Sequence, residues 1–358
     1  MYLPRIMIDR FGWPGFIAFA VPNVLGCAAF GYVVKTRERS EAMVRRHGAA
    51  MGWFSVITVA YHLFFVVWLF DALLPHLREH WWLPLAAAGI VYGLGLVFSF
   101  FDDRDFLWLT VLVYGASLSV FAFVGFDALR IIQWTGSEPR TELAWLAPTI
   151  IFGFLLCPYM DLTFHRSLQQ SPSRNAFAIF GVSFAVMIFL TCMIWFSPAM
   201  METGMLPAMA IAHILTQCVF TVGAHLREVR LSSHLAGAHR QTIAMIVPLL
   251  GVGLPYAGAL ISQGPAIGND LYLRFLAFFG LVFPAYVLIF MSGRPDAIQS
   301  RRTLALFAIV VLISLPLYEL GFLHHRAWLL VIPLAMLLAL RALSRGRLPS
   351  VGHMVEST

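Results

Sequence analysis

The chain has 358 residues, of which 60% are hydrophobic and 12% charged, and its mean hydropathy is +0.80. Soluble domains carry about 25% charged residues, so this composition excludes a soluble globular protein and indicates an integral membrane protein. The net charge of +6 comes without a basic stripe interleaved with aromatic residues, so we expect no nucleic acid among its partners.

Apolar runs follow one another along almost the whole chain, and charged or turn residues separate them. The runs lie at residues 12–34, 51–75, 82–101, 106–129, 143–166, 176–198, 205–224, 242–262, 270–292, 303–322 and 326–344. Because about 20 residues cross a bilayer as a helix, this pattern predicts an all-α, polytopic helix bundle with about 11 transmembrane helices. We expect one transmembrane domain over residues 1–348 and a short disordered cytoplasmic tail at residues 349–358.

The first run contains a proline near its centre. Pro22 lacks the N–H group that would bond the carbonyl four residues earlier, and the Asn23 side chain could bond that carbonyl instead. Asn23 is therefore either a local structural residue or part of a polar site. The run is also too long, and too interrupted at Pro22, for a cleavable signal peptide.

Polar side chains also lie inside the second and seventh runs. His62 is central to the second, and His213, Thr216 and Gln217 are central to the seventh. A histidine inside a membrane protein either hydrogen-bonds a neighbouring helix or contributes to a functional site. Because the two histidines lie at similar predicted depth, a shared polar pocket is one of the two hypotheses.

The fifth run, within Leu143–Gln170, predicts a broken helix. Pro158 removes a backbone donor and disfavours helical geometry in the residue before it. Tyr159, Asp161 and His165 follow directly, and if the helix resumes, the last two share a face. Transporters bind ions or polar solutes with such ionisable groups beside freed carbonyls. The alternative is a kinked span whose polar end emerges into cytoplasmic water.

The distribution of basic residues predicts the orientation. Most of the 24 Lys and Arg residues fall on the side that holds Lys35–Ala50, the connection between the first two runs. The positive-inside rule places that side and the C-terminus in the cytoplasm, so we expect a multi-pass protein of the inner (plasma) membrane. Interfacial anchors expected near the outer ends of spans are Asp71, Asp127, Arg130, Glu319, Trp81, Trp82, Trp134 and Trp145.

The sequence contains no phosphate-binding glycine loop and no CxxC, HExxH or GxSxG motif. We therefore expect no enzyme, no metal centre and no resident cofactor, apart from Na⁺ as a candidate coupling ion. The four cysteines all fall inside apolar runs, which favours buried thiols over disulfides.

The stretch FGWPGFIAFAVPNVLGCAAFGYVV resembles an early helix of sodium:solute symporter-like proteins. The order of spans around the broken helix also resembles the LeuT-type transporters, over roughly residues 11–292. This resemblance implies two inverted repeats, the second opening at Leu143–Gln170. It implies that His62 and His213 lie on opposite walls of a pocket next to Pro158–Asp161. The chain departs from the family at Thr216, which is followed by glutamine where the sodium site usually has adjacent hydroxyl residues.

A second departure is that the broken helix expected to open the first repeat is missing. The opening segment MYLPRIMIDR is what would follow the outer end of such a helix, and its arginines disfavour translocation without one. We therefore expect either a further apolar helix encoded upstream of Met1 or a naturally truncated transporter.

These observations predict a secondary transporter, or a transporter-fold relative, that moves a small polar solute with Na⁺ or H⁺. Asp161 would bind the cation or a proton, Pro158 would free carbonyls for coordination, and the two histidines would contact the solute or titrate. One alternative is a redox membrane protein in which His62 and His213 ligate haem. Another is a sensor or scaffold that kept the fold and does not transport.

Overall fold

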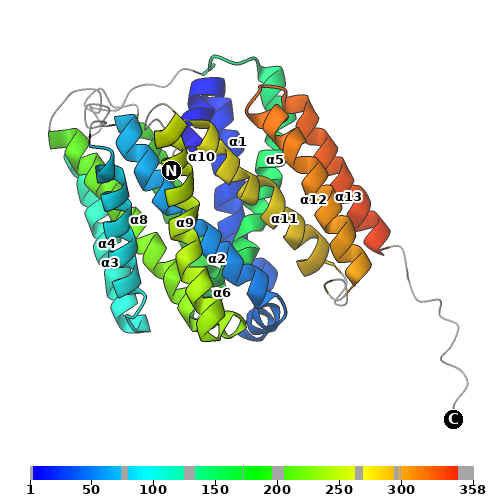
Figure 1. The fold of residues 1–358 in the computed structure, drawn as a ribbon, viewed down its shortest axis with the longest axis horizontal. Helices are drawn as coiled ribbons and strands as arrows, with labels where there is room; N and C mark the ends of the chain where they lie inside the picture. Colours follow the sequence, from blue (N-terminus) through cyan, green and yellow to red (C-terminus); the bar gives the residue numbers. More distant parts are fainter. Residues whose placement is uncertain are drawn as a thin grey trace, which may run out of the picture.

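The computed structural model describes residues 3–73, 80–124, 134–171, 173–195, 205–262, 269–293, 298 and 300–345. Within these ranges the regular elements are all helical, and Figure 1 shows long helices running side by side as a bundle. Nine helices in the described part are long and apolar enough to cross a membrane. The predicted class, an all-α multi-pass membrane protein, is confirmed.

The α-helices are α1 Leu3–Val34, α2 Arg37–Leu73, α3 Trp82–Phe98, α4 Asp103–Val124, α5 Arg140–Leu156, α6 Leu162–Gln170, α7 Ala176–Trp195, α8 Met205–Leu231, α9 Ala238–Ser262, α10 Asn269–Ala277, α11 Phe283–Tyr286, α12 Arg301–Phe322 and α13 Val331–Arg345. Single turns of other helix types are η3 Cys157–Met160, η5 Ser233–Leu235, η6 Phe278–Val282, η7 Val287–Met291 and η9 Ala327–Leu330. The nine candidate spans leave out α3, an apolar helix of 17 residues, and α8, which has 27. The count of about 11 spans therefore stays a prediction, and the predicted tail at residues 349–358 lies outside the described residues.

α2 is the central helix of the bundle. Its most apolar window is 72% buried, whereas that of α4 is 11% buried and faces outward. Helices α3, α6, α8, α9 and α10 all pack against α2. Residues 63–69 are each no more than 3% exposed, as expected of a helix that is apolar on every side. Polar side chains within the buried part of α2 therefore face protein rather than lipid.

The predicted connection Lys35–Ala50 is helical over most of its length. α2 begins at Arg37, so its first turns carry the basic residues and its later turns enter the apolar core. Glu41 lies 2.8 Å from Nε of Arg37 and 3.8 Å from Nη1 of Arg45, both at helical spacing. Such pairs favour a helix even where the sequence is polar, which is why the run of charges did not end it.

α1 bends near its start and not at its centre. The helix continues through Pro22, whereas Gly12 has φ 65° and ψ −150°, a conformation that residues with a Cβ rarely adopt. Pro14 leaves the carbonyl of Arg10 without its helical donor. The backbone N–H of Glu138, just before α5, donates to that carbonyl at 2.7 Å. The helix therefore tolerates Pro22, and its bend lies where another segment satisfies the freed carbonyl.

A second irregular span runs from α10 to η7. It contains two π-helical turns on either side of α11, and Pro284 lies between them. The break in α5 packs directly against the first of these turns, because Cys157 Sγ donates to the carbonyl of Phe279 at 2.9 Å. Gly153 permits the close approach, since a Cβ there would lie 2.9 Å from the same carbonyl oxygen. Two irregular segments thus lie side by side in the bundle.

Candidate polar site at the broken helix

The predicted break in the fifth span is confirmed. α5 ends at Leu156, one 3₁₀ turn follows with Pro158 inside it, and α6 begins at Leu162. Asp161, between the two, has an extended backbone with φ −84° and ψ 111°. Pro158 is buried, and its carbonyl accepts from the N–H of Asp161 at 3.2 Å. The chain thus passes from one helix to a second, short helix within five residues.

Asp161 caps the N-terminus of α6. Its Oδ1 accepts hydrogen bonds from the backbone N–H of Thr163 at 2.8 Å and from the hydroxyl of Thr163 at 2.7 Å. A carboxylate at this position satisfies an orphan donor and interacts favourably with the helix dipole. The other oxygen, Oδ2, lies 4.0 Å from Nε2 of His225 on α8. One carboxylate oxygen is therefore used to build the break, and the second faces α8.

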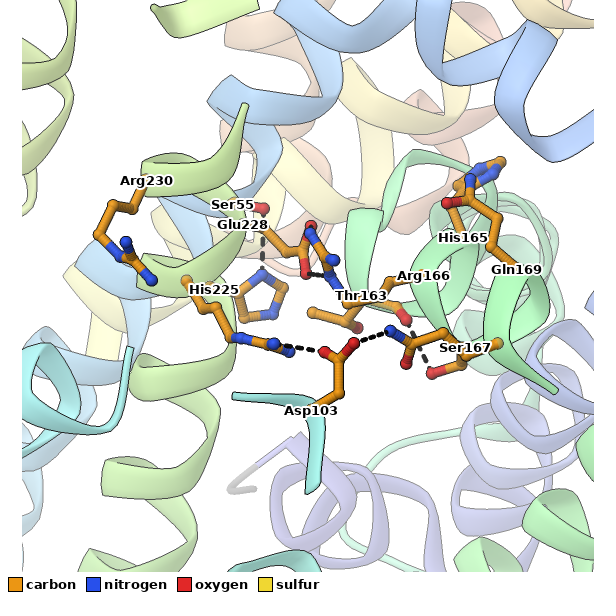
Figure 2. Close-up of polar contacts among 12 residues, drawn as sticks. Ser55, Asp103, Thr163, His165, Arg166, Ser167, Gln169, His225, Glu228 and Arg230 are labelled. Atoms are coloured by element: carbon orange, nitrogen blue, oxygen red, sulfur yellow. Dashed lines mark hydrogen bonds and ion pairs between the residues drawn. The ribbon is translucent and has the colours of Figure 1, made fainter. Parts of the chain in front are cut away.

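His225 connects the break to the central helix. Its side chain is 5% exposed, and its Nδ1 lies 3.2 Å from the hydroxyl of Ser55 on α2. Figure 2 shows Ser55 and His225 facing each other across the gap between α2 and α8. The predicted seventh span stops at residue 224, one residue before His225, so the sequence did not identify this histidine. The signal that could have found it is that α8 continues through Arg230, carrying charged residues past the apolar run.

Charged pairs join α6 and α8 beside this histidine. Arg166 on α6 makes a bidentate ion pair with Glu228 on α8, and Nη2 lies 2.9 Å from Oε2. The Glu228 side chain is 7% exposed. Asp103, at the start of α4, bonds Arg227 and accepts from Nε2 of Gln170 at 2.6 Å. Asp103 of α4 therefore contacts both α6 and α8, and Figure 2 shows its carboxylate with a dashed contact on either side.

His165 turns to a different set of partners. Its Nε2 lies 3.1 Å from the carbonyl of Tyr159, and its Nδ1 lies 2.9 Å from the hydroxyl of Ser40 near the start of α2. Gln169 also donates to that hydroxyl at 2.9 Å. Burial lowers the pKa of His165 to about 4, so the ring is neutral at pH 7. Asp161 is extended and lies just before the helix, so it does not share a helical face with His165 as the sequence predicts.

Two other predicted residues, Tyr159 in the fifth span and His62 in the second, have the following contacts. Tyr159 is buried, and its ring stacks on Phe30 of α1 with 5.6 Å between centroids. His62 lies on α2 with its Nδ1 2.8 Å from the carbonyl of Thr58.

The seventh predicted span, α8, turns its central polar face toward α4. His213 is 6% exposed and packs edge-on against Phe121 of α4. Gln217 donates to the hydroxyl of Ser117, also on α4, at 2.5 Å. Thr216 is exposed, and its hydroxyl donates to the carbonyl four residues earlier in its own helix. The contacts of His213 and His62 thus lie on different helices, and the structure brings His225 to the break instead.

The remaining predicted residues have simple placements. Asn23 is half-buried in α1. Glu319 on α12 pairs with Arg274 on α10, where Nε lies 3.0 Å from Oε1, in keeping with an interfacial role. The expected aromatic belt residues Trp81, Trp82, Trp134 and Trp145 are all exposed, and the four cysteines are free and buried. Asp127, Arg130 and the side chain of Asp71 lie outside the described residues.

Among the described residues, no group of three or more His, Cys, Asp or Glu side chains is arranged to hold a metal ion. Comparison with known protein families, with characterised proteins and with solved structures gives no match. The likeness to LeuT-type transporters therefore rests on the sequence pattern. Any further support must come from how the helices pack against each other.

Proposed function

We propose that this protein is a secondary transporter of the inverted-repeat type, which moves a small polar solute across the membrane together with Na⁺ or H⁺. The observation that carries the proposal is the broken helix from α5 to α6, whose break holds Asp161 against α8 inside the bundle. Non-helical backbone at membrane depth is tolerated only where it is buried in protein or lines a site. A carboxylate at such a break is the arrangement that transporters use to bind an ion or solute.

The contacts between helices support an internal repeat. In our scheme α1, α2, α3 and α4 correspond to α7, α8, α9 and α10. The contact of α3 with α8 then has a counterpart in that of α9 with α2, and the contact of α4 with α8 has one in that of α10 with α2. The helices α1 and α7 pack on each other, and so do α2 and α8, as mates related by a twofold axis would.

This scheme has two further consequences. It requires α3 and α8 to cross the membrane as well, which together with the nine candidates gives eleven spans. It also makes α5 the first helix of the second repeat. The arginine distribution supports a cytoplasmic position for the C-terminus and for the charged network of α6 and α8.

Uptake by proteoliposomes tests the proposal. Purified protein is reconstituted, and uptake of a panel of radiolabelled amino acids and sugars is measured under an inward Na⁺ gradient and under an inward H⁺ gradient. We expect gradient-driven uptake of at least one solute, which Asp161→Asn abolishes and Asp105→Asn leaves unchanged. Asp105 is a suitable control because it is an exposed aspartate in the first turn of α4.

A second measurement does not depend on the choice of solutes. In a background without native cysteines, Thr163→Cys is treated with a membrane-impermeant thiol reagent from each side. Alternating access predicts modification from both sides, whereas a static scaffold exposes the position to one side at most. Modification from one side only, with no uptake of any panel solute, would refute transport. A haem absorption band that His62→Ala removes would favour the redox alternative.

A further inference from the structure

Polar side chains follow one face of α2 into the bundle. Ser55, Thr58 and His62 are spaced by three and four residues, which places them on the same side of the helix. Ser55 is fully buried and Thr58 is 6% exposed. The carbonyl of Thr58 lies 2.8 Å from Nδ1 of His62. At the Ser55 end of this row, the hydroxyl of Ser55 faces His225, and His225 in turn faces Asp161 at the break.

Both ring nitrogens of His225 point at polar groups. Nδ1 faces the hydroxyl of Ser55 at 3.2 Å, and Nε2 faces Oδ2 of Asp161 at 4.0 Å. A neutral imidazole donates from one nitrogen and accepts at the other, and an imidazolium donates from both. A serine hydroxyl can either donate or accept, so the ring can gain a proton without turning over. The distance of 4.0 Å is too long for a hydrogen bond, and a small rotation would close it once the ring is charged.

We propose that Asp161 and His225 together form a proton-binding site, and that the cation to which this protein couples is H⁺ and not Na⁺. This inference rests on the proposed function and makes it more specific. A hard cation such as Na⁺ needs a shell of oxygen ligands, and an imidazole nitrogen suits softer metals instead. Here the group that faces the free carboxylate oxygen is an imidazole, which can bind a proton at a ring nitrogen.

The charged groups around the pair are already compensated. Arg166 on α6 pairs with Glu228 on α8, one turn from His225, and Arg227 pairs with Asp103 of α4. The thiols of two cysteines, Cys27 of α1 and Cys157 of η3, also lie within electrostatic range of Asp161. His62 lies two turns further along α2 from Ser55. The Asp161–His225 pair is therefore where proton uptake changes the net charge of the break.

This change of charge gives a physical basis for coupling. Without the proton, a neutral imidazole faces a carboxylate, and the pair carries a net charge of about −1. With the proton, imidazolium and carboxylate compensate each other. An uncompensated charge is costly to seal away from water, whereas a compensated pair is much less so. Occupancy by H⁺ therefore favours the conformation in which α6 and α8 close over the break.

Infrared difference spectroscopy tests the site without knowledge of the solute. Protein in supported bilayers is stepped from about pH 8 to about pH 5 and, separately, from Na⁺-free buffer to NaCl at constant pH. We expect the pH step to give imidazole and carboxylate bands that Asp161→Asn and His225→Gln both remove. Asp105→Asn and His239→Gln, which change exposed residues, serve as matched controls and keep the bands. We expect the Na⁺ step to give none of these bands.

A third variant, Ser55→Ala, keeps the test decisive if the charge variants do not fold. It keeps both ionisable groups but removes the acceptor for Nδ1–H of the imidazolium, so the midpoint of the pH-induced change should move to lower pH. Bands that persist in both charge variants, or carboxylate bands induced by Na⁺, would overturn the proton site. Uptake driven by Na⁺ alone and abolished by Asp161→Asn would overturn it too while sustaining transport. The expected bands with no uptake of any solute would keep the proton site and overturn the transporter.

Discussion

Breaking the ion pair between Arg166 of α6 and Glu228 of α8 should lower the free energy of unfolding far more than breaking an exposed ion pair. In Glu228→Gln the side chain keeps its size, but the guanidinium of Arg166 loses its counter-charge. Removing one partner of a buried pair costs about 3–5 kcal/mol. The Arg166 side chain is 28% exposed. We therefore expect a loss near the lower end of that range, about 3 kcal/mol of unfolding free energy.

Glu319→Gln is the matched control. It breaks the ion pair with Arg274. The side chain of Glu319 is 34% exposed and that of Arg274 is 49% exposed. Exposed ion pairs contribute about 0–1 kcal/mol to stability. Unfolding of each variant in mild detergent is followed by tryptophan fluorescence as SDS is added, and free energies are obtained by linear extrapolation.

The double variant Arg166→Gln with Glu228→Gln separates charge from packing. It leaves no uncompensated charge in the interior, so it should be more stable than Glu228→Gln alone. The reasoning would be refuted if Glu228→Gln cost no more than Glu319→Gln. It would also fail if the double variant lost as much as the sum of its two single substitutions, because the pair would then contribute nothing as a pair.

Three other predictions concern the backbone, the orientation and the pH response. Gly12→Ala should lower the unfolding free energy by about 1–3 kcal/mol because of its φ of 65°, whereas Gly115→Ala, on an open helical face, should be neutral or stabilising; equal effects in the SDS titration would exclude backbone strain. A membrane-impermeant thiol reagent added outside cells should label Ser137→Cys and spare Glu38→Cys, both exposed positions, and the reverse would invert the topology. Because burial lowers the pKa of His165 to about 4, the unfolded chain binds a proton at higher pH than the folded protein; the stability from this residue is present above about pH 6.5 and lost toward about pH 4, a slope in the unfolding free energy that His165→Gln should reduce.

The class of the fold could be predicted because it depends on composition and on the length of apolar runs, which are local quantities. The break at Pro158 could be predicted for a similar reason, since a proline acts on its own helix. The start of α2 at Arg37 could not, because polarity alone does not end a helix that charge pairs with Glu41 support. Hydropathy identifies where a segment can be buried, and it does not identify where a helix stops.

The residues around Asp161 were only partly predictable. Asp161 itself is identified by its place after a proline in an apolar run. Its partners His225 and Ser55 come from helices that are distant in the sequence, and their approach depends on how α2 and α8 pack. His213 drew attention because it is central to its run, but it faces α4, where it contacts an aromatic ring. Depth along a span can be read from the sequence, whereas the direction in which a side chain points depends on the neighbouring helices.

Proline alone does not distinguish the break between α5 and α6 from the other helices that contain a proline. α9 continues through two prolines and α12 through one. Where α1 bends near Pro14, the N–H of Glu138 satisfies the carbonyl of Arg10, so that irregularity is closed by backbone. The break at Pro158 differs because Asp161 closes it with only one of its two carboxylate oxygens and leaves the other facing His225. Where neighbouring groups hydrogen-bond all the polar groups freed at a helix break, the break only shapes the fold. Where a carboxylate oxygen is left facing another ionisable group, the break can also bind a proton.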